Sequence, residues 1–250
     1  MNKLNLFEKI RIRLNPRYKN MSTSCVGFPI TMVDKSSFLY MYEEIFEEEI
    51  YKFKSQNTKL KIIDCGANIG LSVIYFKKLY PESKIIAFEP DPKIFNVLSS
   101  NIKYGRLENV ELIQKGVSDT QGNIAFIPDN ADGGRLISGK ENAEQILVET
   151  VKLSDYLSEK VDFLKIDIEG EEVKVIEECK NQLKNVENIF IEYHSFVDKE
   201  QQLDKLLKIL HDTGFRYYVH HVGYPKKQLF IETPIYANMD MQLNIYARRQ

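Results

Sequence analysis

From Leu60 onward, short apolar runs alternate with segments of helical periodicity. The apolar runs at 60–64, 84–90, 109–117, 161–168 and 187–194 have the length of buried strands. Helical patterns follow most of them, which is typical of parallel β-α-β units. Two final strands, 215–222 and 242–249, have no helical pattern between them, so we expect them to pair antiparallel. The pattern predicts an α/β fold with a doubly wound, mostly parallel seven-stranded sheet.

The first 57 residues precede this alternation. We predict that residues 1–57 form an N-terminal helical extension or cap, and residues 58–250 the ligand-binding domain. A helix is predicted over Ser37–Phe53, and a basic amphipathic helix near the N-terminus. We expect the latter to pack on its own domain, with contact to an anionic membrane as the alternative. Two runs, 122–128 and 147–153, indicate an inserted hairpin or edge strands.

Composition restricts the function classes. The net charge is −2, so no broad positive field favours nucleic acid as a partner. The three cysteines are scattered and form no C-x-x-C pair, as expected of unlinked thiols in a reducing, cytoplasmic compartment. No apolar stretch reaches the ~20 residues that a membrane span requires, and no secretory signal is recognised.

A glycine loop carries the main functional signal. The run Ile62-Ile63-Asp64-Cys65-Gly66-Ala67-Asn68-Ile69-Gly70 takes a predicted strand through a glycine turn into a helix. Glycines there let the backbone approach a ligand, and the helix start offers free N–H groups. Glu89 ends the next strand, 19 residues after Gly70. A carboxylate at that place can accept hydrogen bonds from both hydroxyls of a ribose.

The loop favours S-adenosyl-L-methionine over a dinucleotide. The dinucleotide fingerprint is G-x-G-x-x-G, and Asn68 stands where a pyrophosphate would need glycine. Asp64, just ahead of the turn, would repel phosphates but suits a ligand with ammonium and sulfonium groups.

Four segments together resemble the FkbM-type S-adenosylmethionine-dependent methyltransferase family. They are IIDCGANIGLS, AFEPDPKIFNVLSSNI, GVSD and LKIDIEGEE, within roughly residues 38–195. The resemblance implies a class I, Rossmann-like methyltransferase that methylates hydroxyls of sugars, glycan precursors or other small metabolites. It also implies cofactor contacts: to the methionine part from Asp64, Gly66, Ala67, Asn68 and Gly70, to the ribose from Glu89, and to the adenine from Val117 and Ser118.

The segment Lys165–Gly170 is the predicted site of the chemistry. Asp167 and Glu169 lie two residues apart, so they share a face of an extended strand. Methyl transfer needs an aligned acceptor, and a hydroxyl acceptor also gains from a general base. Asp167 is expected to contact the cofactor and to act in catalysis. Glu169 is a second candidate, although it is also placed to cap the following helix.

His194, at the end of the fifth strand, is a third candidate base, with an ordinary pKa near neutrality; a purely structural role is the alternative. Asp167, Glu169 and His194 could also bind a divalent ion. Because no fourth ligand is evident, we predict no required metal.

Three other functions stay open. A NAD-dependent oxidoreductase on a Rossmann-like fold is the rival enzyme, and a catalytically inactive methyltransferase-like binding module is the non-enzymatic rival. A nucleic-acid methyltransferase lacks its expected basic surface and N-P-P-Y tetrad. The expected partner is a small-molecule acceptor, with a homo-oligomer possible. Specificity is expected from residues 1–57, 119–150 and 223–241.

Overall fold

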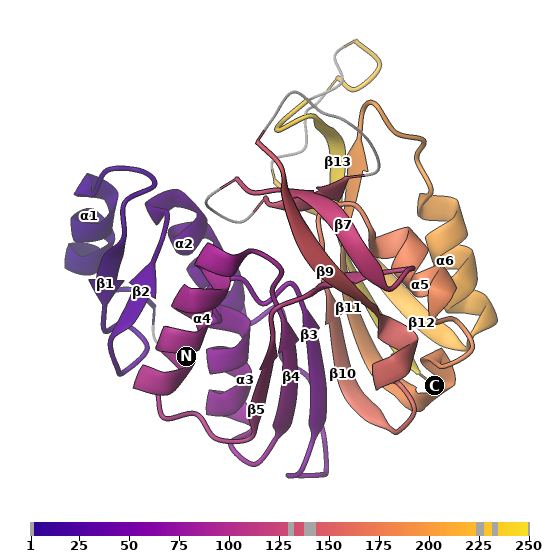
Figure 1. Cartoon of the computed structure of the whole chain (residues 1–250), viewed down its shortest axis with the longest axis horizontal. Coiled ribbons are helices and arrows are strands. Elements are labelled where there is room, and N and C mark those ends of the chain that lie inside the picture. The colour runs from indigo at the N-terminus through magenta and orange to yellow at the C-terminus, as the bar shows by residue number, and fades with distance from the viewer. Residues whose placement is uncertain (1–2, 130–132, 138–143, 224–227, 232–234, 250) are drawn as a thin grey trace.

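The computed structural model describes residues 3–129, 133–137, 144–223, 228–231 and 235–249. A seven-stranded sheet in the order β12-β13-β11-β10-β3-β4-β5 forms its centre (Figure 1). Strand β13 is antiparallel to both of its neighbours, and the other neighbouring pairs are parallel. The predicted mostly parallel, Rossmann-like sheet is therefore confirmed. The strands are β3 (Lys61–Cys65), β4 (Lys84–Phe88), β5 (Val110–Ile113), β10 (Val161–Ile166), β11 (Val186–Phe196), β12 (Phe215–His221) and β13 (Met239–Arg249).

Helices cover both faces of this sheet. Successive side chains of a strand point to opposite faces, and Ile62 and Ile63 accordingly belong to two different hydrophobic clusters. The cluster of Ile62 contains α3 (Leu71–Leu79) and α4 (Pro92–Tyr104). The cluster of Ile63 contains α5 (Glu172–Glu178) and α6 (Leu203–Asp212). Burial on both faces explains why the strands read as nearly continuous apolar runs.

The N-terminal residues pack against the α3 and α4 face. They form α1 (Leu6–Leu14), a hairpin of β1 (Met21–Thr23) and β2 (Ile30–Met32), α2 (Lys35–Tyr42) and a π-helical turn (Glu43–Glu47). The predicted helix Ser37–Phe53 is too long, because Glu49 adopts a left-handed φ of 57° just beyond the π turn. Phe38 and Phe46 share the cluster of the main domain. The division at residue 57 remains a proposal.

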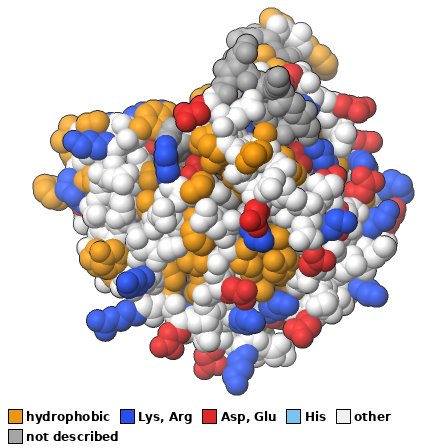
Figure 2. Space-filling view, viewed as in Figure 1, with side chains coloured by type: hydrophobic (Ala, Val, Ile, Leu, Met, Phe, Trp, Pro, Cys, Tyr) orange, Lys and Arg blue, Asp and Glu red, His pale blue; other side chains and the backbone are white. Residues whose placement is uncertain are grey.

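Only one side of helix α1 packs against the rest of the chain. Ile12 is buried, whereas Phe7 and Leu14 are 78% and 79% exposed. In the part of the chain that the structure describes, no helix is long and apolar enough to cross a membrane. Figure 2 shows acidic and basic side chains interspersed on the visible face rather than one continuous basic surface.

The predicted third strand, 109–117, is two strands. Its first half is β5, and its second half is β6 (Gly116–Ser118), which belongs to a separate four-stranded sheet. A tight turn divides them, in which the Lys115 N–H donates to the Ile113 carbonyl (2.9 Å). The second sheet also contains β7 (Gly122–Ile127), β8 (Arg135–Ile137) and β9 (Ile146–Lys152). The two predicted insertion strands are β7 and β9, which pair antiparallel.

The chain changes direction across the sheet between β3 and β10. From β3 it proceeds through α3 to β4, and from β10 it proceeds through α5 to β11 on the other side. The carboxyl ends of β3 and β10 thus meet at a topological switch point, the usual ligand-binding place of such sheets.

Two glycines of the loop, Gly66 and Gly70, allow neighbouring segments to pack closely at the switch point. Gly66 has a φ of 90°, and a Cβ there would lie 1.9 Å from the Asp167 carbonyl oxygen. A Cβ on Gly70 would lie 2.7 Å from Leu98 Cδ1. Our expectation that these glycines mainly admit a ligand was therefore incomplete: the first lets the loop sit on the end of β10, and the second lets α3 approach α4.

We predict that Gly66→Ala lowers the free energy of unfolding by at least about 3 kcal/mol, since it adds an overpacking clash to a left-handed backbone. The matched control is Gly223→Ala, where φ is 82° but no atom lies within 4 Å of the added Cβ. The control should lose about 1 kcal/mol. Urea denaturation of both variants measures the difference, and equal losses would contradict the packing argument.

Candidate active site

A pocket opens at the switch point, above the carboxyl ends of β3, β4, β10 and β11. The extension and the four-stranded sheet form its other walls. Its lining includes Gly66, Ala67, Asn68, Glu89, Asp91, Lys115, Gly116, Val117, Lys165, Asp167, Glu169, Glu192 and Gln242, with Tyr40, Met41, Glu44, Ile45 and Tyr51 from the extension and Phe126, Asp129, Gly134 and Leu136 from the insertion.

Glu89 is held rigidly at the pocket wall. It is 7% exposed. Its Oε2 accepts the Asn68 N–H (3.0 Å), and its Oε1 accepts the Asp91 N–H (2.9 Å). Each oxygen keeps a lone pair for a further donor. Burial raises the pKa of Glu89 to about 8, although both N–H groups favour the ionised carboxylate.

Not every residue assigned to the cofactor lines the pocket. Asp64 is fully buried below the glycine loop, where its Oδ2 accepts the Ser72 hydroxyl (2.5 Å). Asp64, Gly70 and Ser118 are absent from the lining, whereas Val117 belongs to it. Asp64 is thus placed to position the loop and the start of α3, and its contact with a cofactor remains a prediction.

Lys165 joins the elements that build the pocket floor. Its ammonium donates to the Gly66 carbonyl (2.8 Å) and lies 3.2 Å from both Asp64 Oδ1 and Asp167 Oδ2. Burial lowers the pKa of Lys165, but the charges of Asp167 and Asp64 outweigh that cost and raise it. The lysine therefore stays charged and ties the glycine loop to β3 and to the end of β10.

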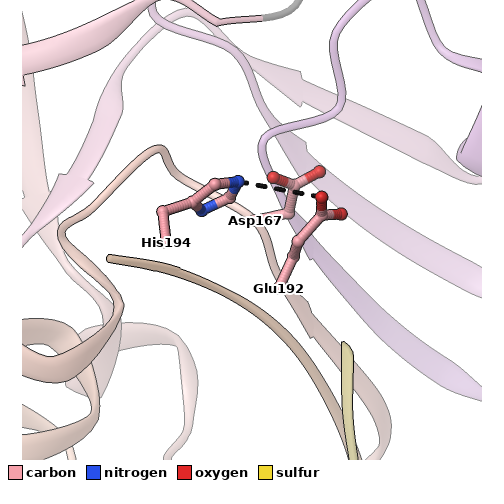
Figure 3. Close-up of side chains that lie close together, drawn as sticks. All are labelled: Asp167, Glu192 and His194. Atoms are coloured by element: carbon pink, nitrogen blue, oxygen red, sulfur yellow. Dashed lines mark ion pairs between the residues drawn. The ribbon is translucent and has the colours of Figure 1, made fainter. Parts of the chain in front are cut away.

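Asp167 lies next to two acidic side chains and a histidine. Asp167 and Glu169 both line the pocket, as does Glu192 of β11. Behind them His194 is buried, with its Nδ1 3.0 Å from Glu172 Oε1 and its Nε2 3.7 Å from Glu169 Oε2. Figure 3 shows the side chains of Asp167, Glu192 and His194 pointing toward one another. The structure thus brings the three predicted catalytic residues together.

The charges around His194 bear on its predicted role as a base. Burial lowers the pKa of His194, but the carboxylates of Glu169 and Glu172 raise it well above its ordinary value. A histidine held in its charged form does not take up a proton near neutral pH. Its assignment as general base remains a prediction, and this environment counts against it.

Two residues of this cluster were missed in the sequence. Glu192 precedes His194 by two residues on β11, so the strand period places both side chains on one face. This two-residue period could have identified Glu192 from the sequence. Glu172 gave no comparable signal, because its role comes from the loop after β10: its Oε1 accepts the N–H groups of Ile168 (3.3 Å) and Gly170 (2.9 Å).

The wall of the pocket that the N-terminal extension forms is acidic as well. Tyr40 and Glu44 face it from α2 and the π-helical turn. Burial raises the pKa of Glu44 to about 7. Residues 1–57 and the insertion thus both contribute to the pocket walls. Of the described residues in the predicted specificity segment 223–241, none is part of the lining.

The strand order, the glycine loop and the acid after the second strand are those of a class I methyltransferase fold. Residues 64–217 match the Methyltransferase FkbM domain, so the chain belongs to the FkbM methyltransferase family. The predicted resemblance is confirmed. Membership of a methyltransferase family also counts against the alternative of a NAD-dependent oxidoreductase.

Individual relatives agree with this assignment. The chain is 30% identical over 220 residues to methyltransferase sdnD of Sordaria araneosa, covering 73% of this chain and 84% of that protein. It is 31% identical over 153 residues to the 2-O-methyltransferase NoeI of Sinorhizobium fredii, covering 53% of this chain and 62% of that protein. Among solved structures, M. jannaschii TYW2 in complex with AdoMet shares the fold, with a TM-score of 0.52, 17% identity, and coverage of 95% of this chain and 90% of that one.

Proposed function

We propose that the protein is an S-adenosylmethionine-dependent O-methyltransferase that acts on a hydroxyl of a sugar, a glycan precursor or another small metabolite. The observation that carries the proposal is the juxtaposition, at one switch point, of the rigid Glu89 carboxylate and the acidic cluster around Asp167. The Glu89 carboxylate suits the ribose of the cofactor, and the acidic cluster suits an acceptor that donates hydrogen bonds.

The residues present fit S-adenosylmethionine. Glu89 offers two oriented oxygens to ribose hydroxyls, and the Gly66–Asn68 loop lines the pocket beside it. Asp167 and Glu169 supply negative charge toward an ammonium or sulfonium group. When bound, the cofactor would supply an electrophilic methyl group on a positively charged sulfur.

The chain's own part in the reaction is to orient the acceptor and to receive one proton. The bound cofactor would supply the methyl group to the acceptor oxygen and leave as S-adenosylhomocysteine, and the hydroxyl proton of the acceptor would pass to a carboxylate oxygen of this chain. We assign that proton to Asp167, because it lines the pocket and its side chain is 26% exposed, whereas the side chain of His194 is 1% exposed. The pocket walls would hold the acceptor hydroxyl against the methyl group. Such positioning of two reactants supplies a large part of the barrier lowering in reactions of this kind.

The acidic lining also supports the acceptor class. Glu44, Glu169 and Glu192 face the space beyond Asp167. Carboxylates accept hydrogen bonds from hydroxyls and repel phosphate or carboxylate groups. A neutral polyhydroxyl acceptor fits this wall, in keeping with the Sinorhizobium fredii relative, which is a 2-O-methyltransferase.

We predict that cofactor affinity depends on the ionisation of Glu89. With a pKa of about 8, Glu89 is mostly protonated at pH 6.5 and mostly ionised at pH 8.5, and only the ionised form accepts two hydroxyl donors. Binding should therefore tighten about 10-fold or more as the pH rises through this range. Calorimetry with methylthioadenosine, which has the ribose but no amino acid group, measures this without interference from a titrating ligand.

The matched variant is Glu89→Gln, which keeps the shape but cannot ionise. It should bind more weakly than the wild type at pH 8.5 and show a flat pH profile. A wild-type profile as flat as that of the variant would remove Glu89 from the ribose site.

We predict that Asp167→Asn lowers methyl transfer about 10²–10⁴-fold, the usual contribution of a proton acceptor, while S-adenosylhomocysteine still binds within a few-fold of wild type. Transfer of a tritiated methyl group to a panel of monosaccharides, glycosides and polyols measures turnover. Asp212→Asn, an exposed aspartate on α6 paired with Lys208, is the control and should leave turnover unchanged. Cofactor binding by the wild type without transfer to any acceptor would favour the inactive binding module.

A further inference from the structure

We propose that Asp167, Glu192 and His194 form a binding site for a divalent cation of the magnesium–manganese class. One potential ligand atom from each residue lies within 4.8 Å of the other two. Figure 3 shows the three side chains converging from the end of β10 and from β11. The sequence alone suggested no required metal, because Glu192 was not recognised as a ligand.

The sheet fixes this convergence. Strands β10 and β11 are parallel neighbours, with Ile166 opposite Ile191, so Asp167 follows directly beside Glu192. Glu192 and His194 are two residues apart on β11 and share a face. Metal–oxygen bonds of about 2.1 Å put neighbouring ligands of an octahedral ion about 3 Å apart and opposite ones about 4.2 Å apart.

The hydrogen bonding of His194 suits a metal ligand. Glu172 Oε1 already accepts two backbone N–H groups and lies 3.0 Å from Nδ1, so it acts there as the acceptor of an Nδ1–H donor. The other ring nitrogen, Nε2, then faces Glu169 and Glu192, each at 3.7 Å, and lies 3.4 Å from the side-chain amide of Gln242. On metal binding, Nε2 would give up its proton and bind the ion in its place. A carboxylate that holds one ring nitrogen while the other points at an ion is the usual outer-shell arrangement of histidine ligands.

The charge balance of the cluster also favours a cation. Asp167, Glu169, Glu172 and Glu192 contribute four carboxylates around one histidine. Lys165 is shared between Asp64 and Asp167. Glu192 is 8% exposed and Glu172 is 1% exposed, and buried carboxylates are costly without opposite charge. A divalent ion would provide that charge at the place where the carboxylates meet.

Two oxygen ligands and one imidazole nitrogen, with positions left open toward the pocket, suit Mg²⁺ or Mn²⁺. Asp167 and Glu192 line the pocket, so the open positions face the acceptor space. In a role that rests on the proposed function, the ion would bind adjacent hydroxyl oxygens of the acceptor and make the methylated one easier to deprotonate. One carboxylate oxygen of Asp167 would then bind the ion, and the other would remain to receive the hydroxyl proton.

The test is titration of the metal-free full-length protein with Mn²⁺, in the absence of cofactor and acceptor. We expect one site by calorimetry, and an electron spin echo signal from a coordinated imidazole nitrogen. Glu192→Gln and His194→Ala should each weaken binding at least 10-fold, and His194→Ala should abolish the nitrogen signal. Glu172→Gln, a positioning change, should weaken binding about 10–100-fold.

The matched control is Glu159→Gln, an exposed glutamate just before β10, at the opposite edge of the sheet, which should bind Mn²⁺ as the wild type does. Binding of S-adenosylhomocysteine is measured on the same proteins, which reports on both their folding and the cofactor site. Absence of Mn²⁺ binding by a wild type that binds S-adenosylhomocysteine would overturn the metal site and leave the proposed function standing. Mn²⁺ binding that is equal in all variants would also overturn it.

Discussion

The buried ammonium of Lys165 is the contact on which the arrangement of the site depends. It touches the Gly66 carbonyl, Asp64 and Asp167, which belong to the glycine loop, β3 and the end of β10. Burying a lysine costs several kcal/mol unless its charge is matched and its hydrogens are bonded. Because its partners lie on the segment from β3 into the glycine loop and at the end of β10, the charge holds these two neighbouring segments in one relative position.

The other parts of the site follow from that position. Gly66 must lack a side chain, since the loop sits directly on the carbonyl of Asp167. Asn68 then reaches Glu89 with its backbone N–H, which orients the carboxylate into the pocket. On the far side, β11 places Glu192 and His194 next to Asp167. The proposed cofactor side and the proposed acceptor side of the pocket therefore meet at the switch point between β3 and β10.

Most of the fold could be predicted from the apolar pattern, because strands buried on both faces leave long apolar runs and their helices leave stripes. The pattern failed where local backbone geometry intervened. The run 109–117 was predicted as one strand, yet a turn at Lys115 sends its second half into another sheet. The helix from Ser37 ends early because Glu49 turns left-handed. Glu49 has no glycine or proline next to it, whereas Gly116, directly after the turn at Lys115, was a signal that the prediction did not use.

The candidate site was only partly predictable, for a similar reason. The motifs placed Glu89, Asp167 and Glu169 at the pocket. The predicted extended strand through Asp167 and Glu169 was wrong, because β10 ends at Ile166 and Glu169 adopts a left-handed φ of 56°. The strand period of β11 could have found Glu192 beside His194. The position of Asp64 below the loop depends on Lys165 and Ser72, which are contacts between segments that no local pattern encodes. The same holds for Glu172, whose partners lie in a loop with left-handed residues at Glu169 and Gly170.

The most direct test of the central claim is a crystal structure of the protein with S-adenosylhomocysteine. The account predicts that both ribose hydroxyls bind the Glu89 carboxylate, and that the sulfur lies over the end of β10, facing Asp167. A ligand bound elsewhere, or bound here with its ribose away from Glu89, would contradict it.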